Sequence, residues 1–165
     1  MRASDCLTAS MIEVGMKYEK KISFSHEDVE TYCRLADDQN SIHRCLEAAR
    51  VRFPDIDDIV VPGGLLQIAI AGLFGSYFPG DGSLGLTFEP DRVRKPIRPG
   101  DELLISLEVM RLRREMAEFK ITITDATGDQ ISGAKSRVML PDKAYRARRI
   151  NNYKRQKFLS SCSLN

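Results

Sequence analysis

The chain has 165 residues, of which 42% are hydrophobic and 29% are charged, which fits one globular domain with a sizeable core. No apolar run reaches the ~18 residues that a membrane-spanning helix needs. The first residues also lack the charged-then-apolar layout of a signal peptide. These features exclude an integral membrane protein and favour a cytoplasmic location.

The formal net charge of +2 hides a basic C-terminal end, because residues 142–165 carry only one acidic side chain, Asp142. Their basic side chains are Lys143, Arg146, Arg148, Arg149, Lys154, Arg155 and Lys157. Such a segment favours anionic partners, but it contains no aromatic platform in a folded sheet that would stack bases. We interpret it as a solvated terminal helix or a disordered extension, and nucleic acid is not an expected partner.

The cysteines form no Cys-x-x-Cys pair, so neither a zinc site nor a redox motif is expected. They are Cys6, Cys33, Cys45 and Cys162. Cys33 and Cys45 fall on apolar positions of the helices predicted below, and we interpret both as small core residues.

The N-terminal part of the chain predicts an irregular strand and then a helix. Residues 1–10 are expected to be disordered, and residues 11–24 mix glycine with strand-forming residues. Ser25 is a suitable N-cap, and acidic residues follow it in the first turn, where they favour the helix dipole. Apolar residues then repeat at helical spacing, which predicts an amphipathic helix over residues 26–36.

A second short helix is predicted from Ser41 to about Val51, after a polar loop at residues 37–40. Asn40 is its expected N-cap. Its apolar positions again follow the helical period: Ile42, Cys45, Leu46 and Ala49. Residues 52–61 are then expected to form a loop that leads into a short extended piece.

Pro62-Gly63-Gly64 ends that extended piece, and nearly every residue from Leu65 to Phe78 is apolar. A helix that is apolar all round is expected to be buried all round. Since this segment is too short to cross a membrane, it predicts the central helix of the fold. The Pro79-Gly80-Asp81-Gly82 turn ends it.

The period then changes to two, which predicts strands joined by tight turns. The alternating stretches are residues 84–89, 105–110 and 119–124, with a weaker one at 130–140. One face of each strand is apolar, so we expect an antiparallel sheet with one covered face. Only the central helix is apolar enough to cover it. The predicted class is therefore α+β, with an antiparallel sheet wrapped around one long buried helix, the hot-dog architecture.

Asp38 and His43 form the most informative pair in the chain, because they lie five residues apart on either side of Asn40. If Asn40 caps the helix, Asp38 lies in the preceding loop and His43 in the first turn, so both side chains can face one cleft. A carboxylate and an imidazole in that arrangement can hold and activate a water molecule.

Four segments, in this order, resemble those of MaoC-type hot-dog hydratases and are similar to (R)-specific enoyl-CoA hydratases. The resemblance covers roughly residues 18–141. The segments are Ala36 to His43, matching the family's Asp-x-Asn-Pro-x-His; Ile59 to Leu65; Pro79 to Ser83; and Val93 to Asp101.

The resemblance implies a reversible addition of water to a trans-2-enoyl thioester of CoA or acyl carrier protein, and it gives Asp38 and His43 the acid–base roles. Backbone N–H groups of Gly63 and Gly64, at the start of the central helix, would stabilise the enolate-like oxygen. Asn40 is a further expected substrate contact. No metal and no cofactor are expected, apart from the CoA or phosphopantetheine that belongs to the substrate.

The same resemblance predicts the organisation and the partners of the chain. Residues 1–17 are an N-terminal lead-in, residues 18–141 the hot-dog domain and residues 142–165 a basic tail. A homodimer or a higher homo-oligomer is expected, because the family pairs two units into one continuous sheet. Arg92, Arg94, Lys95 and Arg98, or the basic tail, are expected to meet the phosphates of the substrate.

Three positions depart from the family pattern. Ser41 stands where the family has proline, Pro62 where it usually has histidine, and Ile68 near a serine often found in the central helix. Without proline the loop is expected to survive but to hold its geometry less tightly, by about 0.4–1 kcal/mol of chain entropy. Unusual substrate choice or weak activity follows as an expectation.

Three alternatives stay open. The first is a hot-dog acyl-thioester binding module with weak or no catalysis. The second is a hot-dog thioesterase, although residues 65–78 contain no carboxylate. The third is a β-hydroxyacyl-carrier-protein dehydratase, which Arg52-Phe53-Pro54 resembles, but Arg52 and Ile68 stand where that family needs histidine and glutamate.

Overall fold

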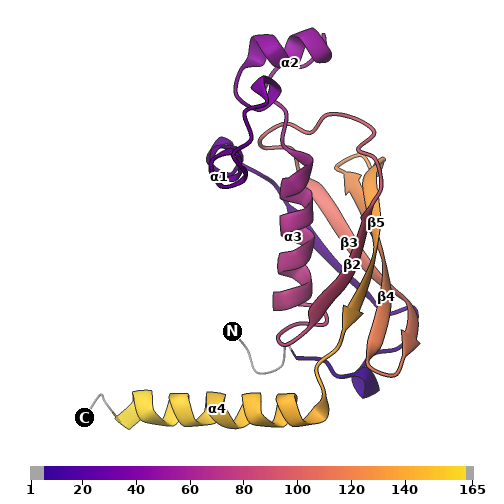
Figure 1. Ribbon diagram of the computed structural model, residues 1–165, viewed down its shortest axis with the longest axis vertical. Helices are drawn as coiled ribbons and strands as arrows, with labels where there is room; N and C mark the ends of the chain where they lie inside the picture. The colour runs from indigo at the N-terminus through magenta and orange to yellow at the C-terminus, as the bar shows by residue number, and fades with distance from the viewer. Residues whose placement is uncertain (1–5, 163–165) are drawn as a thin grey trace.

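The computed structural model describes the backbone of residues 6–162 and the side chains of residues 6–152. One antiparallel sheet with the strand order β1-β3-β4-β5-β2 curves around the helix α3, Gly63–Ser76 (Figure 1). The strands are β1 (Lys17–Ile22), β2 (Leu84–Pro90), β3 (Leu103–Arg113), β4 (Met116–Asp125) and β5 (Gln130–Met139). The predicted α+β class, the four alternating strands and the hot-dog architecture are confirmed.

The core lies between α3 and the concave face of the sheet. Alternate residues of β3 and β4 point inward and are fully buried, as the period of two requires. They meet the sheet-facing side of α3 in one hydrophobic cluster, whose members include Leu66, Ile70, Phe74, Leu107 and Ile121. At its centre the ring of Phe119 packs edge-on against Phe74, with ring centres 5.0 Å apart.

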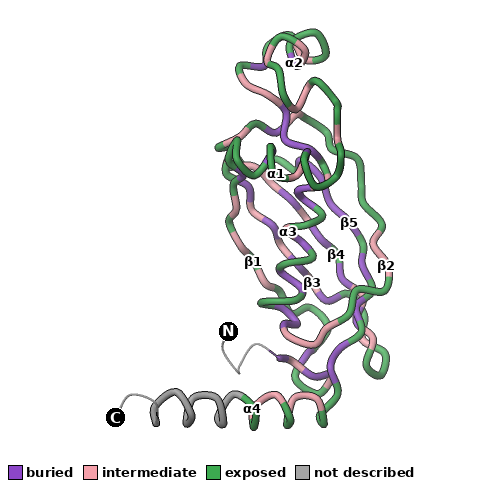
Figure 2. Tube along the Cα trace, turned by 60° about the vertical axis from the view of Figure 1, so that its left-hand side comes forward, coloured by how far each residue is buried: buried purple, intermediate pink, exposed green. Residues whose placement is uncertain are grey.

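The other side of α3 is open, so the expectation that this helix is buried all round is wrong for the single chain. Gln67, Ile68, Ala71 and Gly75 are exposed, and the side of α3 nearest the viewer in Figure 2 carries exposed residues. Ile68 is 55% exposed although it is a large aliphatic residue. A sheet that curves past one helix covers only one of its sides.

Three short helices form a cap at the N-terminal end of α3: α1 (His26–Ala36), the 3-10 turn η2 (Ser41–His43) and α2 (Leu46–Arg52). Helix α2 lies above that end and α1 beside it (Figure 1). The predicted helix over residues 26–36 is confirmed, including its N-cap, because the Ser25 hydroxyl accepts from the Asp28 amide. The Asp28 carboxylate accepts in return from the amide and the hydroxyl of Ser25, and these two hydrogen bonds hold its pKa below the usual value.

The single helix predicted from Ser41 to Val51 is wrong, because the chain breaks between η2 and α2. Cys45 is extended there and precedes α2 as its N-cap. The break turns the Cys45 side chain to solvent, so its predicted core role is also wrong, whereas Cys33 is buried as expected. The carbonyl of Ile42 accepts from the Val60 amide at 3.0 Å, and this long-range bond competes with helical continuation.

The segment that starts at Cys6 and the first turns of the C-terminal helix meet below the C-terminal end of α3 (Figure 1). Cys6 is buried and bridges to Gly80, so residues 6–10 are not disordered as predicted, and residues 1–5 lie outside the described residues. A further 3-10 turn, η1, spans Ala9–Met11. Burial, and next the Asp81 carboxylate, raise the pKa of the Cys6 thiol.

The basic C-terminal segment forms a helix, α4 (Lys143–Cys162), which projects beyond the rest of the molecule (Figure 1). Its first turns are anchored, because Arg149 Nε lies 2.6 Å from Asp81 Oδ2 and the Tyr145 hydroxyl donates to the same oxygen at 3.1 Å. Arg146 donates to the carbonyl of Cys6. Of the two interpretations of this segment, the helix is confirmed. Within residues 6–162 no helix combines the length and apolar character that crossing a bilayer demands.

Replacing Phe119 by alanine tests the core. The side chain is 1% exposed and packs edge-on against two phenylalanine rings, so Phe119→Ala should cost about 3–5 kcal/mol of unfolding free energy. Urea denaturation of the purified variant measures this change. The matched control is Met110→Ala, at an exposed position on a neighbouring strand, which should stay within about 0.5 kcal/mol of the parent. Equal effects at both positions would contradict this description of the core.

Replacing Asp81 by asparagine tests the anchor of α4. The change removes the charge that binds Arg149 and should weaken docking by roughly 1 kcal/mol, which makes amide exchange in residues 143–152 about fivefold faster. Hydrogen exchange followed by mass spectrometry measures this, with β3 and β4 as internal references. Asp91→Asn is the matched control, because Asp91 pairs with Arg94 instead. Unchanged exchange in α4 would show that Asp81 does not anchor it.

Candidate functional site

The loop between α1 and η2 places Asp38 and His43 beside each other, as the sequence predicted. Helix α1 ends because Asp37 adopts a left-handed conformation with φ of 49°, and the amide of Asp38 then donates to the Cys33 carbonyl at 2.9 Å. Asn40 caps η2 by accepting from the Ile42 amide. Asp38 thus precedes the cap, and His43 lies in the turn that follows it.

The imidazole of His43 is held by the chain that leads into α3. Its Nδ1 lies 2.6 Å from the carbonyl oxygen of Val60. A carbonyl can only accept, so Nδ1 carries a proton and the neutral ring has its lone pair on Nε2. Nε2 lies 4.0 Å from Asp38 Oδ2, and the two side chains are only 11% and 26% exposed.

The carboxylate of Asp38 is held in turn by its own loop. Oδ1 accepts from the Asn40 amide at 2.9 Å, and Arg44 donates to the Asp38 carbonyl at 2.8 Å. Oδ2 is left facing His43. A separation of 4.0 Å is too long for a hydrogen bond, but one water about 2.8 Å from each atom spans it. The pair therefore presents two acceptors to the two protons of one water molecule.

The N-terminal end of α3 lies next to this pair along the chain. Val60, which holds His43, is three residues before Gly63, so the two positions are at most about 11 Å apart. The N-cap of α3 is Pro62, which makes no side-chain capping bond, and the first turn contains no acidic residue. The amides of Gly63 and Gly64 have no acceptor within the helix and lie at the positive end of its dipole.

Gly63 is exposed at the surface of the protein. The side chain of Asn40, in contrast, contacts the main chain of its own loop. The Asn40 side chain is exposed, and its oxygen faces the Ile42 amide at 3.4 Å. Its role as a substrate contact stays a prediction. Ser41 follows without the proline of the family pattern, and the cap together with Arg44 holds the loop.

A cavity of about 570 Å³ adjoins the His43 ring on the side of α1. Apolar side chains of α1 and of the chain before α3 form its inner wall, and Arg34 and Arg44 line it with Glu30 and Asp37. This open space, bounded by charges of both signs, can admit a polar ligand to the imidazole of His43.

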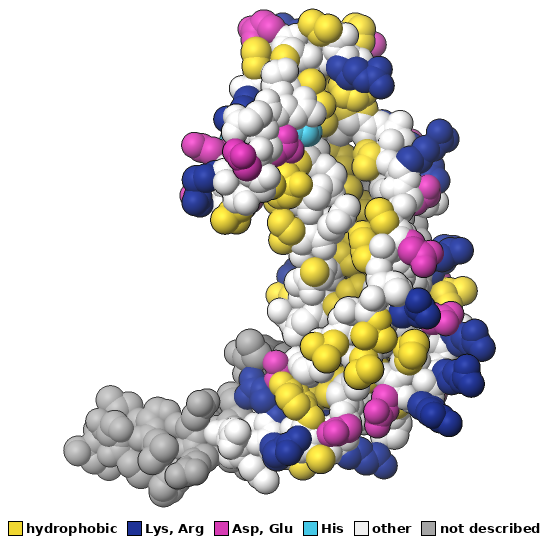
Figure 3. All heavy atoms as spheres, viewed as in Figure 1, with side chains coloured by type: hydrophobic (Ala, Val, Ile, Leu, Met, Phe, Trp, Pro, Cys, Tyr) yellow, Lys and Arg dark blue, Asp and Glu magenta, His cyan; other side chains and the backbone are white. Residues whose placement is uncertain are grey.

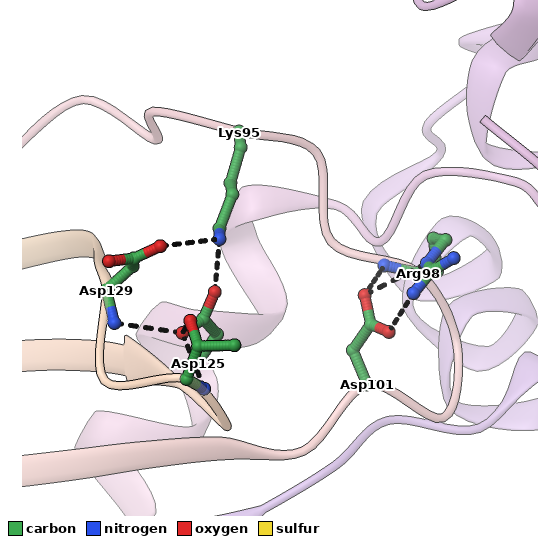
Figure 4. A network of polar contacts seen from close by, with 6 residues as sticks. Lys95, Arg98, Asp101, Asp125 and Asp129 are labelled. Atoms are coloured by element: carbon green, nitrogen blue, oxygen red, sulfur yellow. Dashed lines mark hydrogen bonds and ion pairs between the residues drawn. The ribbon is translucent and has the colours of Figure 1, made fainter. Parts of the chain in front are cut away.

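The basic residues predicted to contact phosphate lie on the loop between β2 and β3, and three of the four are paired with carboxylates. Arg94 binds Asp91, and Arg98 binds both Asp101 and Asp57. Lys95 binds Asp125 and Asp129 on the β4–β5 turn (Figure 4). The ammonium of Lys95 lowers the pKa of Asp125, and that carboxylate raises the pKa of Lys95.

Arg92 is exposed, and no side-chain ion pair of it occurs among the described residues. Lys95 and Arg98 line a second cavity of about 610 Å³ together with Asp101 and Asp125. Phosphate contact by these basic residues stays a prediction, since a phosphate would compete with carboxylates already in place.

Three residues of the site were missed by the sequence reasoning: Tyr32, Arg44 and Val60. Val60 acts through its carbonyl, which no side-chain pattern reveals. Arg44 directly follows His43, and its charge next to the pair was the available signal. Tyr32 lies on α1, where its spacing fits the apolar side of the helix, and the double glycine at 63–64 was the available sign of a close contact with α3.

Comparison with known proteins finds relatives that are named as hydratases or dehydratases of acyl thioesters. The chain is 30% identical to the (R)-specific enoyl-CoA hydratase of Aeromonas caviae over 109 residues, which are 66% of this chain and 79% of that protein. It is 22% identical to the mitochondrial 3-hydroxyacyl-[acyl-carrier-protein] dehydratase FERN of Solanum lycopersicum over 143 residues, 84% of each chain.

The solved structure of the (R)-hydratase of A. caviae involved in PHA biosynthesis matches with a TM-score of 0.72 at 28% identity. The match covers 79% of this chain and 98% of that one. No protein-family model matches the chain.

Proposed function

Because this chain belongs to the family of the (R)-specific enoyl-CoA hydratases, we propose that Asp38 and His43 add water reversibly to a trans-2-enoyl thioester. One observation carries the proposal: two acceptor atoms, His43 Nε2 and Asp38 Oδ2, face each other 4.0 Å apart, and one water can span that distance. Among the described residues, this pair adjoins the open N-terminus of α3 through Val60.

Substrate binding places the thioester carbonyl at α3. The oxygen accepts from the free amides of Gly63 and Gly64, where the helix dipole favours developing negative charge. These donors are part of the main chain and need no reorganisation during the reaction. They are therefore worth most in the transition state, when the carbonyl becomes enolate-like.

The chemical step uses the water held between the pair. As the water oxygen bonds to the β-carbon, the electrons of the C=C bond move toward the carbonyl oxygen. His43 Nε2 accepts one proton of the water, while Asp38 accepts a hydrogen bond from the other and stabilises the imidazolium. The imidazolium then returns the proton to the α-carbon on the same face, which gives the 3-hydroxyacyl thioester. The reverse sequence is dehydration.

The carrier of the acyl group is a CoA or an acyl carrier protein, and the reaction as proposed needs no cofactor beyond it. Every proton in the scheme moves between water, substrate and the two side chains. The phosphate contacts at Arg92, Arg94 and Lys95, the substrate contact at Asn40, the division at residues 17 and 141, and the cytoplasmic location stay predictions from the sequence.

Of the alternatives, the thioesterase and the binding module have less support. A thioesterase needs a carboxylate on or near the central helix, and α3 contains none. A binding module needs no acid–base pair, so the geometry of Asp38 and His43 would have no purpose in it. Turnover is the property that separates the module from the enzyme.

The pair is tested by Asp38→Asn and His43→Ala in an assay that follows the loss of enoyl absorbance with crotonyl-CoA and longer 2-enoyl-CoAs. Asp38→Asn removes the negative charge that orients the water and stabilises the imidazolium, and His43→Ala removes the base, so each should lower kcat by about 10²–10⁴-fold. His26→Ala is the matched control, because it alters the other histidine, and it should keep kcat within about threefold.

Two results would overturn the hydratase. Thioester binding without turnover at any chain length would favour the binding module. Release of free thiol at the same rate as the loss of enoyl absorbance would favour the thioesterase.

We further propose that two copies of the chain associate through β2. This strand forms one edge of the sheet and exposes Leu84 (61%) and Leu86 (44%). Between β2 and the open side of α3 lies a cavity of about 440 Å³, and hydrophobic side chains are visible along this face in Figure 3. Antiparallel pairing of two β2 strands about a two-fold axis would join the sheets and cover this side of α3.

A charge on this surface tests the dimer. The parent protein should have twice the mass of one chain by light scattering at micromolar concentration, and Leu86→Glu should shift it toward one mass because the carboxylate would be buried unpaired. Leu35→Glu, at an exposed leucine of α1, is the matched control and should leave the mass unchanged. A monomeric parent protein would exclude this association.

A further inference from the structure

The side chain of Tyr32 lies directly on the glycine at the start of α3. A Cβ atom on Gly64 would lie 2.1 Å from the Tyr32 hydroxyl oxygen and 2.6 Å from two carbons of its ring. Real Cβ atoms do not approach other atoms so closely, so the tyrosine occupies the space that any other residue at position 64 would need. The hydroxyl thus reaches the main chain of the first turn of α3.

The hydroxyl of Tyr32 is not used by the protein itself. Among the described residues it makes no hydrogen bond to another protein group, although the ring packs against the core cluster. Every fully buried side-chain oxygen or nitrogen among the described residues has a hydrogen-bond partner. Since the Tyr32 hydroxyl has none, its oxygen is not fully buried. A donor at the opening of the site is therefore free for a ligand.

The first turn of α3 otherwise offers only main-chain donors. Its residues are Gly63, Gly64, Leu65 and Leu66, preceded by Pro62, and none has a side chain that can donate. The nearest atom to a Cβ on Gly63 would be a methyl group of Val93, at 3.9 Å. The substrate oxygen that meets these amides thus finds side-chain donors only from neighbouring elements.

We propose that the Tyr32 hydroxyl, packed on Gly64, donates a third hydrogen bond to the thioester oxygen beside the amides of Gly63 and Gly64. This inference rests on the proposed hydratase function and adds a substrate-contacting residue to it. The phenol donates this hydrogen bond without transferring its proton to the substrate. Its role is to stabilise negative charge on the oxygen, alongside the helix dipole.

Glycine at position 64 is required for this arrangement. A methyl group there meets the phenol, so Gly64→Ala would push the hydroxyl away from the amides and disturb the oxygen site. The position of Tyr32 on α1 therefore depends on the glycine on α3, because only a residue without a side chain leaves room for the phenol.

The first test compares kcat of the full chain with that of Tyr32→Phe, which keeps the ring and removes only the donor. We expect kcat to fall about 10- to 100-fold, somewhat less than the 10²–10³-fold typical of a principal oxyanion donor, because two amides remain. Tyr77→Phe is the matched control, since Tyr77 lies at the opposite end of α3, and it should keep the parent kcat.

The second test reads the polarisation of the carbonyl directly. A 2,4-dienoyl-CoA bound to Asp38→Asn, in which turnover is strongly slowed, should absorb at longer wavelength than free ligand because the donors draw electrons to the oxygen. The red shift should be smaller in Asp38→Asn/Tyr32→Phe. An unchanged red shift, or an unchanged kcat in Tyr32→Phe, would overturn the role of Tyr32 as a donor.

The two proposals fail in distinguishable ways. If the parent protein hydrates no enoyl thioester, the proposed function fails before Tyr32 is tested. If the parent turns over and Asp38→Asn abolishes this, while Tyr32→Phe retains full kcat and the full red shift, only the inference about Tyr32 fails.

Discussion

The hydrogen bond between His43 and the carbonyl of Val60 joins the two halves of the site. One partner belongs to the cap of short helices, and the other to the chain that leads into α3. The bond fixes the tautomer of the imidazole and directs Nε2 toward Asp38. It also ties the acid–base pair to the helix whose free amides receive the substrate oxygen. Without it, the cap would carry a carboxylate and an imidazole with no fixed relation to α3.

The remaining architecture supports this arrangement from both sides. The curved sheet buries one side of α3 in a core of alternating strand residues, which holds the helix rigidly enough to present its N-terminus. A second small cluster, Ala49, Ile56 and Val60, packs α2 against the same piece of chain. Because Val60 belongs to that cluster and also accepts from His43, packing of the cap and orientation of the imidazole depend on one another.

Much of this arrangement could be predicted from local patterns. The period of two located four strands, and the cap at Asn40 placed Asp38 before the turn and His43 within it. Contacts between distant segments could not be predicted. The break at Cys45 depends on the bond between Ile42 and Val60, 18 residues apart in the sequence, and it made the single helix from Ser41 to Val51 wrong.

The open side of α3 and the ion pairs of the basic loop have similar explanations. The apolar sequence of α3 indicates that its surface should be buried, but not whether the same chain buries all of it. Ile68 is therefore exposed where full burial was expected. The charges of Lys95 and Arg98 suggested phosphate, whereas carboxylates at Asp125 and Asp57 reach them from loops distant in the sequence. In both cases the partner lies beyond the range of a local pattern.

The most direct measurement is a crystal structure of the inactive Asp38→Asn variant with a trans-2-enoyl-CoA. The account predicts the thioester oxygen within hydrogen-bond distance of the amides of Gly63 and Gly64. It also predicts an ordered water between residue 38 and His43 Nε2, facing the β-carbon. An acyl group bound elsewhere, or an imidazole turned away from Val60 and from the β-carbon, would contradict it.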